Sequence, residues 1–238
     1  MNNGEMECPH CTSTHVTKNG HRRGKQNYHC QSCGRQFIAS YSTKGYTDQV
    51  KRHCLTLYVN GMGFRAIERC TGVNHNTVIQ WVKQSGEQLA DAPSGQMIPE
   101  LAQIDELQTF VGSKKNKIWL WTAVNGHEAG ILAWVLGDRS AATFWQLWLV
   151  LRCWKCFLYI TDAYRVYRCF IDEGDHLVSK LAMTRVEGEN SRLRHYLARL
   201  HRKTFCYSKS KEMLRYSIRL LLHYLKFWTV PIPIQPSL

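Results

Sequence analysis

No apolar run in this sequence is long enough to cross a membrane, and the first residues lack the apolar core of a secretory signal peptide. Acidic residues are also scarce: 18 aspartates and glutamates stand against 31 lysines and arginines, a formal net charge of +13. These absences argue against a membrane-spanning or exported protein and predict a cytoplasmic one. The basic excess favours a polyanionic partner, most often nucleic acid, and therefore association with the nucleoid.

The ten cysteines are expected to be metal ligands and buried thiols, because disulfides rarely persist in a reducing compartment. Cys8 and Cys11 form one Cys-x2-Cys pair, and Cys30 and Cys33 form a second pair after 18 intervening residues. Two such knuckles can present four thiolates to one tetrahedral ion, which is typical of structural zinc. We therefore predict that residues 1–44 form a small zinc ribbon, which the metal holds folded.

Residues 45–86 have the pattern of three short helices. Apolar residues recur at helical spacing from Val50 to Tyr58, and a turn at Gly72 precedes a third helix for which Asn74 is the expected N-cap. Two helices joined by a glycine turn, the second polar on its outer face, are typical of a helix-turn-helix. The expected base-reading residues are Asn74, His75, Asn76, Thr77 and Gln80. The alternative is a three-helix unit without a role in DNA binding.

Two segments lack periodicity. Residues 87–99 carry turn formers and are predicted to be a linker, and residues 229–238 form a proline-rich tail. Between them, residues 100–228 are expected to form the largest domain.

This largest domain is expected to alternate strands and helices in a recognisable order. Strands are predicted over residues 101–111, 117–124 and 129–136, followed by a helix after Ser140, a buried strand that ends at Asp162, a short strand from His176 and a long helix from Thr184. Such an order is that of a ribonuclease H-like domain. The expected fold class is therefore multidomain α/β: a zinc β-ribbon, a three-helix helix-turn-helix unit and a ribonuclease H-like domain with a mixed sheet.

Acidic residues of this domain are candidates for an active site. Asp162 follows a strand buried on both faces, where a carboxylate needs a cationic partner or a metal ion. Asp105 lies on the first strand. Glu187 and Glu189 begin the last helix but differ in direction by about 200°, so only one can face the site. We expect Glu187, with Glu189 as the open alternative. Arg194 lies seven residues after Glu187, on the same face, where it could bind a substrate phosphate.

Carboxylates that converge from distant elements can hold two divalent ions, Mg²⁺ or Mn²⁺. Such ions activate a water or a 3′-hydroxyl for phosphoryl transfer. Basic residues are expected to form a DNA track beside these acids and on the ribbon. For any single residue, an ordinary solvated surface is the alternative. The candidates are Arg22, Arg23, Arg192, Arg199, Arg202, Lys203 and Lys209.

Together these motifs resemble those of transposases of the insertion-sequence-one family, which are DDE-type enzymes. The resemblance covers nearly the whole chain and rests on the two cysteine pairs, Arg65-Ala66-Ile67, Thr71-Gly72-Val73, Asp105-Glu106, Thr161-Asp162, Arg185-Val186-Glu187 and Phe205-Cys206-Tyr207-Ser208-Lys209-Ser210. It implies that the N-terminal modules bind terminal inverted repeats and that the catalytic region cuts DNA and joins it to a target.

The resemblance also implies roles for individual residues. Asp105, Asp162 and Glu187 would be the metal-binding catalytic triad, with Arg194 as its basic partner. Because transposition brings two DNA ends together, a homodimer or a larger assembly is expected.

Two other functions fit parts of the sequence. A DNA-binding regulator would carry inactive carboxylates, and metal-dependent nicking separates it from a transposase. A ribonuclease H-like nuclease would cleave hybrids or junctions, but the N-terminal modules suit a reader of linear duplex ends better. A further pair, Cys153 and Cys156, lacks a second knuckle and is expected to be ordinary thiols.

Overall fold

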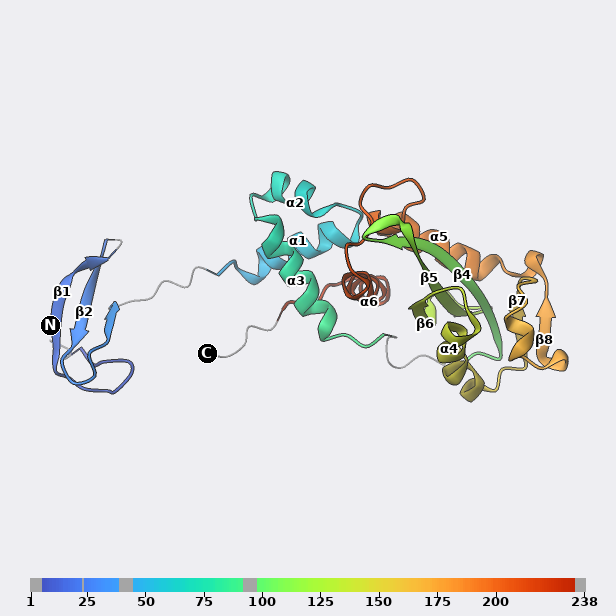
Figure 1. Cartoon of the computed structure of the whole chain (residues 1–238), viewed down its shortest axis with the longest axis horizontal. Helices are drawn as coiled ribbons and strands as arrows, with labels where there is room; N and C mark the ends of the chain where they lie inside the picture. The colour runs from blue at the N-terminus through green and yellow to red at the C-terminus, as the bar shows by residue number, and fades with distance from the viewer. Residues whose placement is uncertain (1–5, 23, 39–44, 92–97, 234–238) are drawn as a thin grey trace. The chain divides into compact units, whose positions relative to one another are not determined.

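The computed structural model describes residues 6–22, 24–38, 45–91 and 98–233 (Figure 1). The chain divides into two compact units, Met1–Tyr46 and Thr47–Leu238, and each is described here by itself. Arg23, residues 92–97 of the predicted linker and residues 234–238 of the predicted tail lie outside the described residues.

The first unit is a three-stranded antiparallel sheet with the order β1-β2-β3. Its strands are β1 (Val16–Arg22), β2 (Lys25–Cys30) and β3 (Gln36–Ile38). The only fully buried apolar side chains among its described residues are Cys8, Cys30 and Phe37, with Tyr28 stacked on Phe37. So small a core cannot balance the entropy of folding by burial alone, so the unit needs a further source of stability.

The second unit begins with α1 (Asp48–Val59), α2 (Phe64–Thr71) and α3 (His75–Glu87), at the positions expected from the sequence. Thr47 caps α1 by accepting the Val50 N–H. Gly72 ends α2 in the left-handed conformation, at φ 72°, which glycine adopts without steric cost. Asn74 then caps α3 by accepting the Asn76 N–H at 2.9 Å. Contacts within a few residues therefore determine the short turn between α2 and α3.

A five-stranded mixed sheet with the order β6-β5-β4-β7-β8 follows. Its strands are β4 (Leu101–Val111), β5 (Ser113–Asn125), β6 (Ile131–Gly137), β7 (Leu158–Thr161) and β8 (His176–Val178). β4, β5 and β6 pair antiparallel, whereas β7 is parallel to β4 and β8 is parallel to β7. These strand directions and this order confirm the mixed α/β class and the ribonuclease H-like topology. The last strand, β8, was expected to run from His176 to Met183 but ends at Val178.

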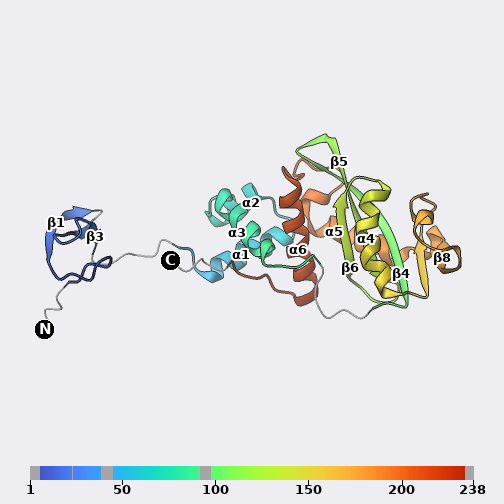
Figure 2. The ribbon, with the colours of Figure 1, turned by 60° about the horizontal axis from the view of Figure 1, so that its bottom comes forward.

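Helices cover both faces of this sheet. α4 (Ala141–Trp154), capped by Ser140 as expected, packs over one face on a cluster that includes Trp121 and Phe144 (Figure 2). α5 (Thr184–Tyr196) and α6 (Lys211–Phe227) lie on the other face. Short 3-10 turns complete the unit: η1 (Tyr167–Cys169), η2 (Glu173–Asp175), η3 (Lys180–Ala182) and η4 (Ala198–Leu200). α5 ends at Tyr196 and is shorter than the long helix expected from Thr184. Leu197 and Leu200 follow its end and are also buried.

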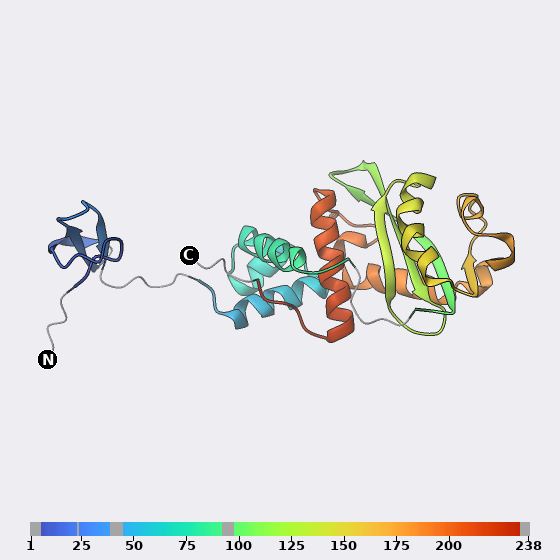
Figure 3. The same ribbon diagram turned by 90° about the horizontal axis from the view of Figure 1, so that it is seen from below.

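Helix α6 was not anticipated, although Met213, Leu214, Ile218 and Leu221 recur at helical spacing after Ser210. It lies between the helices α1–α3 and the sheet (Figure 3). One hydrophobic cluster therefore runs from α1 and α3 through α6 to β5, and residues 47–86 belong to the same compact unit as the sheet. At 17 residues α6 is the longest described helix, and no helix within the described ranges is long and apolar enough to cross a bilayer.

Gly86→Ala should destabilise the second unit, because an added Cβ would lie 2.5 Å from the Tyr216 Cβ and 2.8 Å from its Cα. We expect the free energy of unfolding to fall by about 1–3 kcal/mol, the usual cost of overpacking, in urea titrations. Gly188→Ala in α5 is the matched control. Nothing lies within 4 Å of that added Cβ, so stability should rise, by about 0.5–1 kcal/mol. Equal effects would contradict close contact between α3 and α6.

Candidate active site and metal centre

The four cysteines of the first unit form a compact cluster. Their sulfur atoms all lie within 4.8 Å of one another, with 3.7 Å between Cys8 and Cys33 and 3.6 Å between Cys11 and Cys30. Metal–sulfur bonds of about 2.3 Å in a tetrahedron place sulfur atoms about 3.8 Å apart. The cluster can therefore hold one tetrahedral ion, and four thiolates are the donor set that zinc prefers.

Backbone amides of the two knuckles favour the thiolate form. The N–H of His10 lowers the pKa of Cys8, and the N–H of Cys33 lowers the pKa of Cys30 to about 6. Metal ligands must be deprotonated, so this arrangement prepares Cys8 and Cys30 to bind an ion, whereas hydrogen bonds from the neighbouring thiols raise the pKa of Cys11 to about 12.

Asp105 and Asp162 lie at the same edge of the mixed sheet. Gln103 of β4 pairs with Ile160 of β7 in a parallel ladder, and each acid stands two residues further along its chain. β7 ends at Thr161, so Asp162 is the first residue of the loop that follows. Its carboxylate accepts the N–H of Tyr164 at 2.8 Å, which fixes the loop as it leaves the strand.

Glu187 approaches the same edge from the first turn of α5. Burial raises the pKa of Asp105, and the negative charges of Asp162 and Glu187 contribute to that rise. The three carboxylates are therefore within electrostatic range of one another. Asn190 of α5 donates to the Asp105 carboxylate at 2.9 Å and accepts from Thr122 of β5. This amide holds Asp105 in one orientation and ties the helix to the sheet.

The carboxylate oxygens of the three acids do not all lie within 4.8 Å of one another. Of the residues that the structure describes, only the four cysteines bring three or more ligand atoms within 4.8 Å of one another. Glu187 is exposed, and an exposed glutamate can change rotamer at little cost. The backbone thus brings the acids to one edge from three elements, and the side chain of Glu187 sets the final spacing.

Glu189 faces elsewhere. It is buried, accepts the N–H of Gly130 at 3.0 Å and lies 3.7 Å from a guanidinium nitrogen of Arg192. These contacts fasten α5 to the loop between β5 and β6. Of the two glutamates, the geometry therefore favours Glu187 as the partner of Asp105 and Asp162.

Arg194 carries a donor without a partner. Its Nε is buried and has no hydrogen bond among the described residues. Burial and the positive charge of Arg202 lower the pKa of Arg194, whereas the carboxylate of Asp105 acts in the opposite direction. An unsatisfied buried N–H costs about 1–3 kcal/mol, and the described residues supply no acceptor for this one.

A second charged cluster supports the edge, and the sequence reasoning missed it. The Glu106 side chain is 3% exposed on the opposite face of β4, accepts from the Tyr167 hydroxyl at 2.6 Å and pairs with Arg139. The Arg139 guanidinium also stacks on Trp119 and Tyr164, 4.7 and 4.0 Å from the ring centroids. These contacts link β4 to the chain after β6 and after β7. The signal was present in the Asp-Glu dipeptide, because consecutive strand residues point to opposite faces.

The expected base-reading residues divide into two groups. Asn74 donates to Glu68 at 3.2 Å, and His75 lies 2.7 Å from the same carboxylate, so both side chains serve the turn between α2 and α3. Asn76 and Gln80 are exposed, and Thr77 is half-buried.

The residues expected to contact phosphates differ in exposure. Five of them are exposed or half-buried: Arg22, Arg192, Arg202, Lys203 and Lys209. Arg199 requires a correction. It is 8% exposed, donates to the Ser208 Oγ at 2.6 Å, and its guanidinium lies over the rings of Tyr58 and Phe64. Through these contacts the Arg199 side chain links the N-terminal helices to the segment after α5. We therefore no longer include Arg199 among the residues expected to contact DNA.

Comparison with known proteins places this architecture in context. A family model described as IS1 transposase matches residues 99–228, more than half of the chain. The chain is 34% identical over 113 residues to the insertion element iso-IS1n protein InsB of Shigella dysenteriae, which covers 48% of this chain and 86% of that protein. It is also 34% identical over 112 residues to the IS1 protein InsB of Shigella sonnei, covering 47% of this chain and 86% of that protein. The match to the IS1 9 protein InsB of Escherichia coli K12 has the same identity and covers 67% of that protein.

Cys30→Ser should abolish tight metal binding by the first unit, since it removes one of four ligands. We expect the wild-type chain to bind one Co²⁺ with the absorption spectrum of a tetrahedral thiolate site, displaced by Zn²⁺, and the variant to lose that spectrum. Cys70→Ser, at an exposed cysteine of α2, is the matched control and should retain it. Equal spectra from both variants would remove Cys30 from the ligand set.

Proposed function

This chain belongs to the IS1 transposase family, and from that premise we propose that it is a DDE-type DNA transposase. In this proposal it binds the terminal inverted repeats of an insertion sequence and catalyses divalent-metal-dependent strand cleavage and strand transfer. The observation that carries the proposal is the gathering of Asp105, Asp162 and Glu187 from β4, the end of β7 and α5 at one edge of the sheet.

The three acids suit Mg²⁺, or Mn²⁺, because carboxylate oxygens are the hard donors that these ions prefer. Like charges that raise the pKa of the buried Asp105 also call for a cation among them. Two ions bound there would supply activation of the attacking oxygen and stabilisation of the leaving oxygen. Asp105, Asp162 and Glu187 would be the residues that hold them.

Other residues of the chain position the substrate and the acids. Arg194 donates its free Nε–H to an oxygen of the phosphate that is cut, which satisfies a donor otherwise left unpaired. Asn190 keeps the Asp105 carboxylate turned toward the edge. On the opposite face of β4, Glu106 and Arg139 hold the loops after β6 and β7 against the strand.

DNA recognition is assigned to the N-terminal modules and to the basic surface. α2 and α3 act as a helix-turn-helix, in which Asn76, Thr77 and Gln80 read base edges while Asn74 and His75 shape the start of the recognition helix. A zinc ion at the four cysteines stabilises the ribbon, from which Arg22 and Arg23 contact phosphates. Arg192, Arg202, Lys203 and Lys209 contact the DNA backbone on the surface that leads away from the acids. Joining two ends requires at least two copies of the chain.

Asp162→Asn should abolish nicking yet preserve end binding, because the amide keeps the shape of the carboxylate but loses its charge. The measurement is strand nicking of linear DNA that carries the ends flanking the gene, with Mg²⁺ and with chelator. Gel-shift titration of the same DNA serves as the control for binding. Binding without metal-dependent nicking by the wild-type chain would contradict the transposase and leave a DNA-binding regulator.

Glu187→Ala and Glu189→Ala should separate chemistry from stability. Glu187 is exposed, so its loss should change the free energy of unfolding by less than about 0.5 kcal/mol while nicking disappears. Glu189 is buried and bonded to Gly130, so its loss should cost about 1–3 kcal/mol while nicking persists below the melting temperature. Urea titrations and the nicking reaction report the two effects. The reverse pattern would make Glu189 the third acid.

A further inference from the structure

The hairpin of β4 and β5 extends well beyond the candidate active site. β7 pairs only with Leu101, Ala102 and Gln103 of β4, whereas β4 continues to Val111 before the turn at Gly112. Gly112 lies seven positions after Asp105. At about 3.3 Å per residue, the tip therefore lies roughly 20–25 Å from the acids. We call residues 106–118 the arm.

A second segment fastens the arm along its free edge. Gly112 donates its N–H to the Ser208 carbonyl at 2.7 Å, and Val111 forms a parallel bridge with Ser208. Thr109 donates to the carbonyl of Arg199, whose guanidinium in turn holds the Ser208 hydroxyl. The segment 200–211, which follows α5, is thereby held beside the tip as part of one platform.

This platform is rich in unpaired positive charge. The one acid of the arm, Glu106, is buried and pairs with Arg139, and residues 107–118 and segment 200–211 contain no aspartate or glutamate. Their basic residues are Lys114, Lys115, Lys117, Arg202, Lys203, Lys209 and Lys211. Among the described residues, none of these forms a salt bridge. Surface lysines of a solvated face usually alternate with acids, so a cluster without any acid calls for an external anion.

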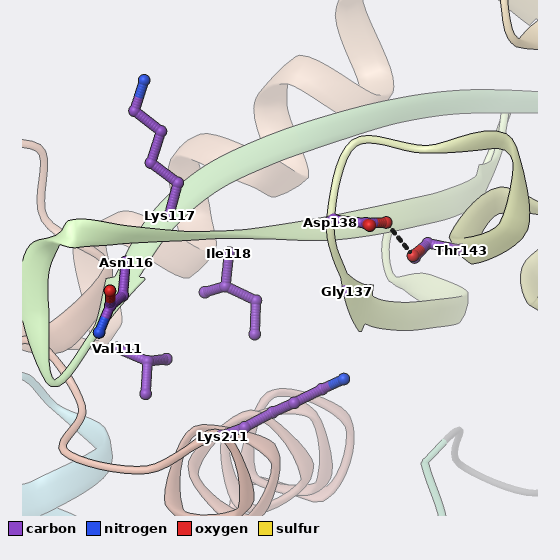
Figure 4. Close-up of a pocket in the computed structure, with 8 residues that line it drawn as sticks. All are labelled: Val111, Asn116, Lys117, Ile118, Gly137, Asp138, Thr143 and Lys211. Carbon is purple, nitrogen blue, oxygen red and sulfur yellow. Dashed lines mark hydrogen bonds between the residues drawn. The ribbon is translucent and has the colours of Figure 1, made fainter.

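The basic side chains of the arm are exposed and lie near two parts of the chain. Lys114, Lys115, Asn116 and Lys117 are consecutive and exposed. Lys114 lies 5.4 Å from the ring centroid of Phe205, on the side of segment 200–211. Lys117 and Lys211 line a pocket of about 430 Å³ together with Asp138, and Lys117 points away from Asp138 (Figure 4). Ser140 and Thr143 donate to Asp138 and lower the pKa of that carboxyl, so its charge is already engaged within the chain.

A cationic path connects the platform to the acids. Arg194 lies within electrostatic range of Asp105 and of Arg202, the first basic residue of segment 200–211. From there segment 200–211 continues past Lys203 to Ser208, whose carbonyl accepts the Gly112 N–H at the tip. The separation of roughly 20–25 Å between the acids and the tip corresponds to six or seven base pairs at about 3.4 Å each.

We propose that the arm and segment 200–211 form a phosphate clamp that grips the backbone of duplex DNA six to seven base pairs from the phosphate that is cut. The clamp makes no base contacts, so it holds the duplex at a set distance without reading its sequence. This inference rests on the proposed transposase function, and it adds a binding surface on the hairpin that the recognition helix does not supply.

The test uses the full chain and the double variant Lys114→Ala/Lys115→Ala. The matched control is Arg152→Ala/Lys155→Gly, which removes the same charge at the end of α4, next to the start of β7 and away from the tip. Glycine is used because Lys155 has φ 49°. The association constant for DNA falls with salt, and each lost phosphate contact should reduce the steepness of log K against log salt by about 0.9. The magnitude of the slope should therefore be smaller by about 1–2 for the arm variant and unchanged for the control.

Position is tested with DNA that carries one neutral methylphosphonate at a time. The wild-type chain should bind more weakly when the neutral linkage lies six or seven base pairs from the cut, and the arm variant should show no such penalty there. Circular dichroism melting curves verify that each variant folds.

The outcomes separate the two proposals. Wild-type binding and nicking with no difference between the arm variant and the control would overturn the clamp and leave the transposase intact. A penalty at the expected linkages that persists in the arm variant would also overturn it. No specific binding or nicking by the wild-type chain would overturn both.

Discussion

The parallel pairing of β4 with β7 is the constraint on which the candidate active site depends. It covers only three residues of β4, yet it brings Asp105 and Asp162, 57 positions apart in the chain, to one edge of the sheet. The Glu106–Arg139 pair then ties β4 to the loops after β6 and β7 from the opposite face. Because β4 continues past this edge, the same strand that supplies the acid also forms the arm.

Charges in this region fall into two physical classes. Glu106 and Glu189 are buried with donors directed at their oxygens, which is how a fold keeps a carboxylate for structure. Asp105 and Arg194 are half-buried: Asp105 lies near two like charges, and the buried Nε–H of Arg194 has no hydrogen-bond partner among the described residues. Like charges held together beside an unpaired donor are typical of a site that an external ligand completes.

Helix α6 and Arg199 join the N-terminal helices to the sheet. Tyr58 of α1 is hydrogen-bonded to Ser217 of α6 at 2.6 Å and also stacks with the Arg199 guanidinium. Since Arg199 holds Ser208 as well, α1 and segment 200–211 are parts of one packed body. In the proposed transposase, the helices that read DNA and the edge that cuts it would therefore keep a constant geometry within a chain.

Local pattern alone was enough for the cysteine pairs, for the caps at Asn74 and Ser140, and for strands and helices whose order predicted the mixed sheet. Each of these depends on spacing or on hydrogen bonds within a few residues. Only tertiary contacts decided the orientation of Glu189, the burial of Arg199 and the partners of Glu106, because periodicity reports which residues share a face but not what that face meets. Helix α6 shows the same limit: its apolar spacing was present in the sequence, but its place between α3 and the sheet follows from long-range contacts such as Gly86 with Tyr216.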